Sequence, residues 1–263
     1  MKTNKSQNHT KYDCYTWIRC LLLTMTMLVA TSSCGENDTE DPALQQDLNT
    51  INAWNAGEKV SEKSIQTYGT DRCFEILTID DALFQRIYKK SFKEDCTIDR
   101  EDLRYLKVLH RNIQGEILLG EMICNKAIAS DLLQIFRQLF DNAYPIERMV
   151  LIDNYDADDT KSMVANNSSA FNFRFISGTT TLSNHSKGMA IDINPLYNPY
   201  VKNRTDGSLY VEPEEGREYA DRSKTFDYKI EKGDLCYRLF IEHGFTWGGE
   251  WTSLKDYQHF EKE

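Results

Sequence analysis

Residues 183–193 read Ser-Asn-His-Ser-Lys-Gly-Met-Ala-Ile-Asp-Ile, a stretch in which polar residues precede a short apolar run. The apolar residues 189–193 predict a short strand, which includes Asp192, an acid that is costly to bury without a partner. His185 stands seven residues earlier, and Gly188 between them permits a sharp turn of the chain. The two side chains could therefore meet at one cation.

A second polar cluster lies close to the end of the sequence, where residues 256–261 read Asp-Tyr-Gln-His-Phe-Glu. Zinc accepts imidazole nitrogen and carboxylate oxygen at about 2.0–2.2 Å. His259 could join His185 and Asp192 as a third ligand and leave an open position for water, which is the catalytic pattern. Asp256 could then act as general base. The spacing alone also permits a second interpretation. A core histidine whose hydrogen bonds are made within the protein and an aspartate at the end of a strand would give the same pattern without a metal ion.

The pattern Ser-x-His-x-x-Gly-x-Ala-x-Asp resembles, residue for residue, the signature of the zinc D-alanyl-D-alanine carboxypeptidase family. Residues 244–251 (Gly-Phe-Thr-Trp-Gly-Gly-Glu-Trp) and 256–261 are similar to the C-terminal motif of the branch that includes L-alanyl-D-glutamate endopeptidases. Residues 169–174 and 192–200 match as well. The resemblance covers roughly residues 100–263.

This resemblance implies a zinc ion held by His185, Asp192 and His259, with Asp256 as the catalytic acid and base. The dipeptidase branch of the family has a glutamate at the position of Asp256. Both residues are carboxylates, so aspartate can serve as acid and base as well. Because its side chain is shorter than that of glutamate, the backbone must lie closer to the zinc-bound water.

The resemblance also implies residues that bind the substrate. Arg174 is similar in placement to an arginine that binds substrate and stabilises the developing oxyanion, and Ser183 matches a substrate contact. Arg174 could instead be a surface arginine. Trp247 and Trp251 flank two glycines and could wall the cleft, with core packing as the alternative.

The activity implied is hydrolysis of peptide bonds in peptidoglycan stem peptides by zinc-activated water. D,D-carboxypeptidase and L-alanyl-D-glutamate endopeptidase specificities are not separated by the sequence. The alternative is a non-catalytic, zinc-stabilised cell-wall-binding lipoprotein on the same scaffold. The related hedgehog signalling domain suggests that a protein can keep this fold without catalytic activity.

The N-terminal segment has the composition of a targeting signal. A basic stretch is followed by the apolar residues 20–30, which span only about 17 Å as a helix and are too short for a hydrocarbon core of about 30 Å. Residues 1–33 and the following Cys34 resemble a bacterial lipoprotein signal with its acylated cysteine; an ordinary secretory signal is the alternative. We expect an exported protein on the bacterial envelope, with a lipid anchor at Cys34 and an acidic tether over residues 34–60.

Composition excludes several other classes. The 263 residues carry 31 basic and 41 acidic side chains, for a net charge of -10, and no dense basic block. Such a chain repels phosphate backbones, so we expect no nucleic-acid partner. A mean hydropathy of -0.57 with a single long apolar run excludes a polytopic membrane protein.

The periodicity of apolar residues predicts an α+β domain over residues 61–263. We expect a central, mostly antiparallel sheet with flanking helices, similar to hedgehog and D,D-peptidase domains. After export, four cysteines leave one or two disulfides possible. The predicted elements are a hairpin (105–111 and 116–125), strands at 149–153 and 189–193, helices at 82–91, 128–143 and 235–243, and a loop at 156–170; the cysteines are Cys73, Cys96, Cys124 and Cys236.

Overall fold

The computed structural model describes residues 41–176 and 179–263. The predicted signal (residues 1–33) and Cys34 lie outside the described residues. Within the described part, no helix has the length and apolar character needed to cross a membrane.

The largest sheet contains four antiparallel strands in the order β1-β4-β3-β2. Its centre is the predicted hairpin, formed by β3 (Leu103–Arg111) and β4 (Ile117–Asn125), which pair along their whole length. In the turn, the Asn112 side chain accepts hydrogen bonds from the amides of Gln114 and Glu116, as a turn asparagine commonly does. The hairpin prediction is confirmed.

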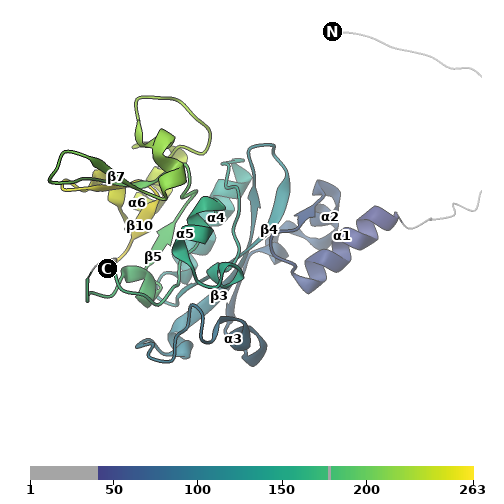
Figure 1. The fold of residues 1–263 in the computed structure, drawn as a ribbon. Helices are drawn as coiled ribbons and strands as arrows, with labels where there is room; N and C mark the ends of the chain where they lie inside the picture. The colour runs from purple at the N-terminus through teal and green to yellow at the C-terminus, as the bar shows by residue number, and fades with distance from the viewer. Residues whose placement is uncertain (1–40, 177–178) are drawn as a thin grey trace, which may run out of the picture. The chain divides into compact units, whose positions relative to one another are not determined.

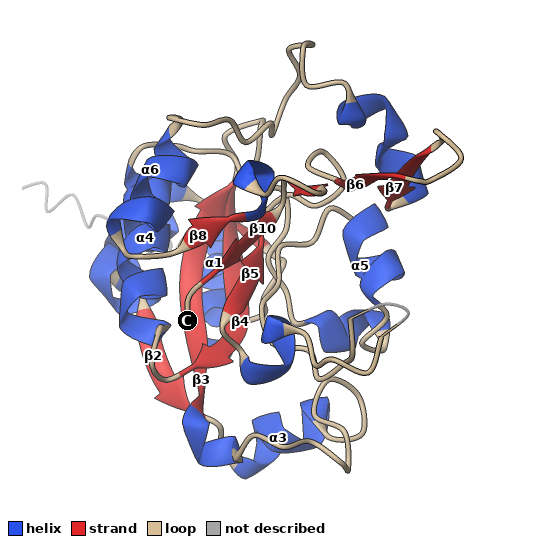
Figure 2. Ribbon diagram, turned by 90° about the vertical axis from the view of Figure 1, so that its left-hand side faces the viewer, coloured by secondary structure: helices blue, strands red, loops and turns tan. Residues whose placement is uncertain are grey.

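Helix α4 (Ala129–Asp141) covers one face of this sheet and confirms the helix predicted over residues 128–143. Helix α6 (Leu235–Glu242) lies beside it (Figure 2) and ends before Gly244, whose φ of 81° suits glycine. The apolar residues of α4 form one helical stripe and fill the core against β3 and β4. The buried stripe consists of Ile128, Leu132, Ile135, Phe136, Leu139 and Phe140.

Two smaller antiparallel sheets follow in the C-terminal half (Figure 1). One has the order β5-β10-β8 and the other β7-β6-β9. Their strands are only two to four residues long, and the strand predicted at residues 189–193 is confirmed as β5. The strands are β5 (Ala190–Asp192), β6 (Tyr200–Asn203), β7 (Leu209–Glu212), β8 (Thr246–Trp247), β9 (Lys255–Asp256) and β10 (His259–Glu261).

The folded unit begins before residue 61, so the boundary predicted there is too late. Helix α1 (Pro42–Ala53) buries Ile51 in the core, and the Trp54 indole donates a hydrogen bond to the carbonyl of Gly120 on β4. These contacts hold part of residues 34–60 against the core, although the acidic composition of that segment predicted a tether. The remaining elements of this half are β1 (Lys59–Val60), α2 (Glu62–Tyr68), β2 (Glu75–Thr78) and α3 (Asp81–Ile87).

Residues 149–153 do not form the predicted strand. The backbone of Val150 instead exchanges two hydrogen bonds with the side chain of Asn167, and a 3-10 helix (Ile152–Tyr155) follows. The side-chain amide takes the place of a neighbouring strand. The predicted loop over 156–170 contains the short helix α5 (Asp159–Val164), which is capped by Asp158.

The described chain is a single α+β domain with antiparallel sheets, as predicted, although three sheets replace the one central sheet expected. All four cysteines in the described part are free thiols, so the possible disulfides are not formed. Burial raises the pKa of Cys73 to about 11 and also raises the pKa of Cys124 and Cys236. These thiols are core residues with little thiolate character.

Candidate metal centre and active-site pocket

Strand pairing brings together two of the predicted ligands. In the β5-β10 pair, His259 stands directly opposite Asp192, and Phe260 stands opposite Ile191. Because side chains alternate across a strand, Ile191 and Phe260 point into the core and are fully buried, whereas Asp192 and His259 share the other face.

A tight turn positions the third predicted ligand. His185 lies on a 3-10 helix (Asn184–Lys187) that Gly188 ends with a left-handed φ of 67°. A side chain at 188 would also stand 2.7 Å from the backbone nitrogen of Asn125, at the end of β4. The amide of Asn125 donates to the Gly188 carbonyl at 2.9 Å. Glycine is therefore required here, and the turn that sets the seven-residue spacing is fixed to the large sheet.

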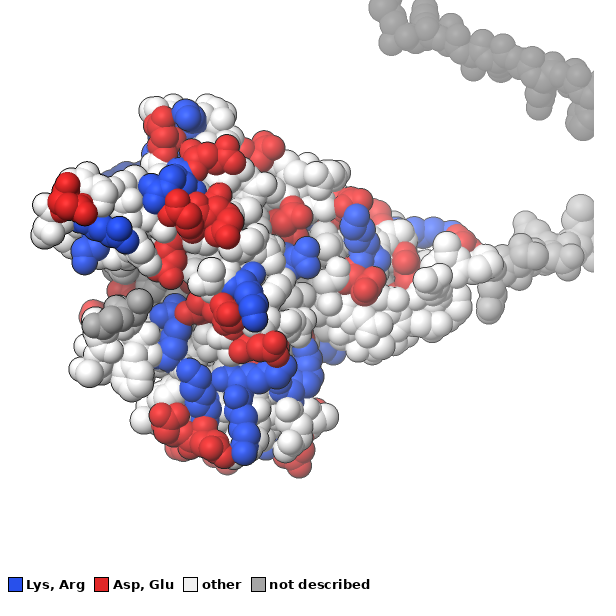
Figure 3. Space-filling model, in the orientation of Figure 1, with Lys and Arg blue, Asp and Glu red and all other residues white. Residues whose placement is uncertain are grey.

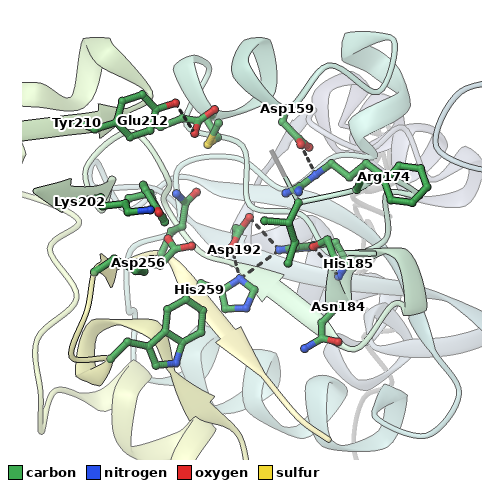
Figure 4. Close-up of a pocket in the computed structure, with 18 of the residues that line it drawn as sticks. Asp159, Arg174, Asn184, His185, Asp192, Lys202, Tyr210, Glu212, Asp256 and His259 are labelled. Carbon is green, nitrogen blue, oxygen red and sulfur yellow. Dashed lines mark hydrogen bonds and ion pairs between the residues drawn. The ribbon is translucent and has the colours of Figure 1, made fainter. Parts of the chain in front are cut away.

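The three side chains converge on one point (Figure 4). The His185 Nε2 and His259 Nδ1 atoms each lie 3.2 Å from an oxygen of Asp192 and 3.2 Å from one another. Ligands bonded to zinc at 2.0–2.2 Å in a tetrahedron stand about 3.4 Å apart. The types of donor atom and the distances between them therefore fit a zinc ion. Among the described residues, these three side chains form a group that could hold a metal ion.

The outward-facing nitrogens of both histidines are held by oxygen atoms. His185 Nδ1 lies 2.6 Å from the carbonyl of Ala170, and His259 Nε2 lies 3.0 Å from Glu261 Oε2. Asn184 donates a hydrogen bond to the same Glu261 oxygen at 2.7 Å. Metal-binding histidines commonly have such partners, which orient the ring and raise its basicity.

The electrostatics of the cluster favour positive charge. Burial would raise the pKa of Asp192, but the neighbouring His185 charge and the hydrogen bonds from both histidines lower it overall. Burial would lower the pKa of His259, but its hydrogen bonds to Asp192 and Glu261 raise it to about 10. A proton on His259 or a bound divalent cation would each supply the charge that these carboxylates favour.

Asp256 lies beside the three potential ligands. It is on β9, opposite Tyr200 of β6, and Gly248 packs so closely that a side chain there would stand 2.8 Å from the Asp256 Cβ atom. Burial raises the pKa of Asp256 to about 7, with the His259 charge opposing and the Asp192 carboxylate reinforcing the rise. A carboxyl with a pKa near neutrality is suited to both accepting and donating a proton.

These residues open into a pocket of about 1220 Å³. The sheet β7-β6-β9 forms one wall, where Lys202 stands opposite Tyr210 and two residues from Tyr200, so all three side chains share the face that carries Asp256. Figure 4 shows Lys202 and Asp256 on the same side of the pocket. Lys202 makes no ion pair with any residue in the described ranges, so its charge is available to a ligand.

Arg174 and Ser183 also line the pocket. The Arg174 guanidinium is paired with Asp159 of α5 (Figure 4), so its charge is partly neutralised within the protein. The Ser183 hydroxyl accepts a hydrogen bond from the amide of His185 at 3.3 Å. Both residues are placed where a substrate could reach them, and each also has a structural contact.

The two tryptophans predicted at the cleft lie in different environments. Trp251 lines the pocket, and its ring centroid is 5.3 Å from that of His259. Trp247 is 5% exposed, packs against Phe260 in the core and donates its indole N–H to the carbonyl of Tyr257. The prediction that Trp247 walls the cleft is wrong, because its strand β8 turns that side chain toward α6.

Sequence reasoning missed several residues that line this pocket. Glu261 had a usable signal, because it stands two residues after His259 and so shares its face of β10. Lys202 and Gln258 carried no signal, since their positions depend on how β6 and β9 pair.

The fold and this cluster define an α+β protein with a candidate His-Asp-His metal centre at the base of a pocket. Residues 177–262 match the family model described as D-alanyl-D-alanine carboxypeptidase. This match supports a relation to that peptidase family over the C-terminal third of the chain. It includes His185, Asp192, Asp256 and His259 but not Arg174. Searches of the curated proteins and of the solved structures found no match.

Proposed function

We propose that this protein is a zinc-dependent peptidase that hydrolyses peptide bonds in peptidoglycan stem peptides. The observation that carries the proposal is the convergence of His185, Asp192 and His259 on one point, with Asp256 beside them in an open pocket. The family match over residues 177–262 supports the same activity.

A bound zinc ion would polarise the scissile carbonyl and make water a stronger nucleophile at neutral pH. Asp256 accepts the proton of the attacking water and delivers it to the leaving nitrogen, so that a C–O bond forms as the C–N bond breaks. Its pKa of about 7 suits both transfers. Arg174 supplies positive charge toward the developing oxyanion, although its pairing with Asp159 reduces that contribution.

The pocket has two groups that could bind a stem peptide. Lys202 offers an ammonium group on the same wall as Asp256, and Trp251 offers an apolar surface over His259. Either D,D-carboxypeptidase or L-alanyl-D-glutamate endopeptidase activity is compatible with this wall.

We further propose export and a lipid anchor at Cys34, on the sequence pattern alone. Figure 3 shows acidic and basic side chains interspersed over the visible face of the molecule, and the net charge of the chain is -10. Such a surface has no strong attraction for an anionic wall polymer. Anchoring would supply the proximity that charge does not.

The test is incubation of the purified protein with muropeptides, with and without a chelator, followed by mass spectrometry. We expect zinc-dependent products whose masses identify the bond. The Asp256→Asn variant, which retains the three potential ligands, is the matched control and should form product far more slowly than the wild type. Zinc binding without any cleavage by the wild-type protein would favour the non-catalytic cell-wall-binding alternative.

A further inference from the structure

Two buried oxygen atoms beside the candidate metal centre have no hydrogen-bond partner among the described residues. They are Oδ1 of Asp256 and Oε1 of Gln258. Gln258 is only 3% exposed, yet it lines the same pocket as Asp256 and His259. Because a buried polar atom without a partner is costly, both oxygens favour a ligand that brings hydrogen-bond donors.

The backbone explains why Gln258 faces the pocket. Its carbonyl accepts a hydrogen bond from the amide of Ile193, which fixes this residue between β9 and β10. Tyr257 is turned away, with its ring stacked under the Arg222 guanidinium at 4.4 Å and near Trp247. The chain bends at residues 257–258, so that Asp256, Gln258 and His259 all line the pocket.

The free atom of the Gln258 side chain is its carbonyl oxygen. Gln258 Oε1 is buried and has no hydrogen-bond partner among residues 41–176 and 179–263. An amide oxygen only accepts hydrogen bonds, so it requires an N–H or O–H donor. A ligand in the pocket that Gln258 lines could supply that donor.

We propose that Gln258 Oε1 accepts the N–H of the scissile peptide bond and so holds the leaving nitrogen beside Asp256. This inference rests on the proposed peptidase function. When water adds to the carbonyl, the nitrogen becomes pyramidal, and an N–H held by Gln258 turns the nitrogen lone pair toward Asp256. Asp256 then transfers to that lone pair the proton it took from water, the C–N bond breaks, and the amine leaves with both hydrogens.

The proposal makes Gln258 a determinant of specificity for amides over esters. In a depsipeptide, the scissile N–H is replaced by oxygen, which gives Gln258 nothing to accept. The experiment compares wild-type protein and Gln258→Met on a synthetic stem peptide and on the depsipeptide of the same sequence. The unbranched methionine preserves length and shape but removes the amide oxygen.

We expect Gln258→Met to lower kcat/KM on the peptide by about 10- to 100-fold, the effect of one lost hydrogen bond at a buried site. On the depsipeptide the change should be smaller than about threefold, within the effect of a single neutral contact. Zinc content and thermal unfolding are measured in parallel. Gln134→Met, on the exposed face of α4, is the matched control and should change neither rate.

Equal losses on both substrates would overturn the proposal, since a structural or water-mediated role does not depend on the substrate N–H. No loss on either substrate would overturn it as well. Gln258→Asn, whose shorter side chain withdraws the acceptor but stays polar, repeats the comparison if Gln258→Met does not fold. Wild-type protein that cleaves neither substrate would overturn the peptidase function itself, together with this inference.

Discussion

The large sheet and the small sheets of this domain serve different purposes. Strands β3 and β4 have nine residues each and pair at nine positions, over a core shared with α4. Strands β5, β9 and β10, which carry the candidate site, have only two or three residues. Long ladders and apolar burial stabilise the first region, whereas the second presents polar side chains whose positions depend on the packing behind them.

The alternation in β5 and β10 shows how the second region depends on the first. Ile191 and Phe260 belong to the same apolar cluster as α4, and each is adjacent in sequence to a potential ligand. Each of the two strands is therefore held in the core by one buried residue, and the adjacent residue on the strand is a potential metal ligand. Substitutions on the two sides of these strands should have separable effects.

The largest effect is expected from His259→Ala. This change removes one of three potential ligands, so we expect stoichiometric zinc to be lost and hydrolysis to fall below detection. Metal analysis and a muropeptide assay measure the two effects. His243→Gln, at a histidine paired with Asp131 away from the pocket, is the control and should keep its zinc. A full zinc content in His259→Ala would contradict the assignment of His259 as a ligand.

Asp256→Asn should separate metal binding from catalysis. We expect zinc to be retained and kcat to fall by about 10²- to 10⁴-fold, the usual contribution of a general acid–base residue. Steady-state kinetics on the zinc-loaded variant give the ratio. Activity close to that of the wild type would remove Asp256 from the mechanism.

Leu106→Ala tests the large sheet and its core. Leu106 lies on β3, is fully buried and contacts the core cluster, so its truncation should lower the free energy of unfolding by about 2–5 kcal/mol. Urea titration measures this loss. Zinc stoichiometry and kcat of the folded variant should be unchanged, and a parallel loss of zinc would show that the two regions are not separable.

The pH dependence of the metal-free protein gives a smaller effect. The pKa of His259 is raised to about 10 from an ordinary value of 6.5. Its contribution to stability is therefore fully present below pH 6.5 and is lost as the pH rises through 10. We expect the free energy of unfolding to fall by on the order of a few kcal/mol over this range.

Urea titrations between pH 7 and 10 check this expectation, because Asp256, whose pKa is about 7, contributes mainly below that window. His259→Gln should remove the His259 part of the dependence, since glutamine does not titrate, and leave only the part due to the buried cysteines, whose pKa values are also raised. A wild-type profile that falls no more steeply than that of the variant would mean that the proton on His259 does not stabilise the fold.

The elements that sequence reasoning placed well are those specified by local patterns. The apolar stripe of α4, the hairpin around Asn112 and the strand before Asp192 each follow from periodicity or turn chemistry over a few residues. The three potential ligands and Asp256 were predicted from a spaced motif, and the structure brings the three potential ligands together.

Other features depend on contacts between distant segments, and the sequence did not specify them. Trp247 was predicted to wall the cleft because glycines follow it, but the pairing of β8 with β10 turns it into the core. Residues 149–153 are as apolar as a strand, yet Asn167 supplies their hydrogen bonds. Helix α1 is preceded by acidic residues and joins the core through Ile51. In each case a partner far along the chain decided the outcome.

The contact between Gly188 and Asn125 joins the two regions through main-chain atoms alone. This contact ties the end of β4 to the loop that bears His185, and the Asn125 side chain adds a hydrogen bond to the carbonyl of Lys187 at 3.0 Å. The exchange of one buried hydrophobic residue for another would leave this main-chain hydrogen bond in place. A side chain at position 188, in contrast, would displace the loop and with it His185.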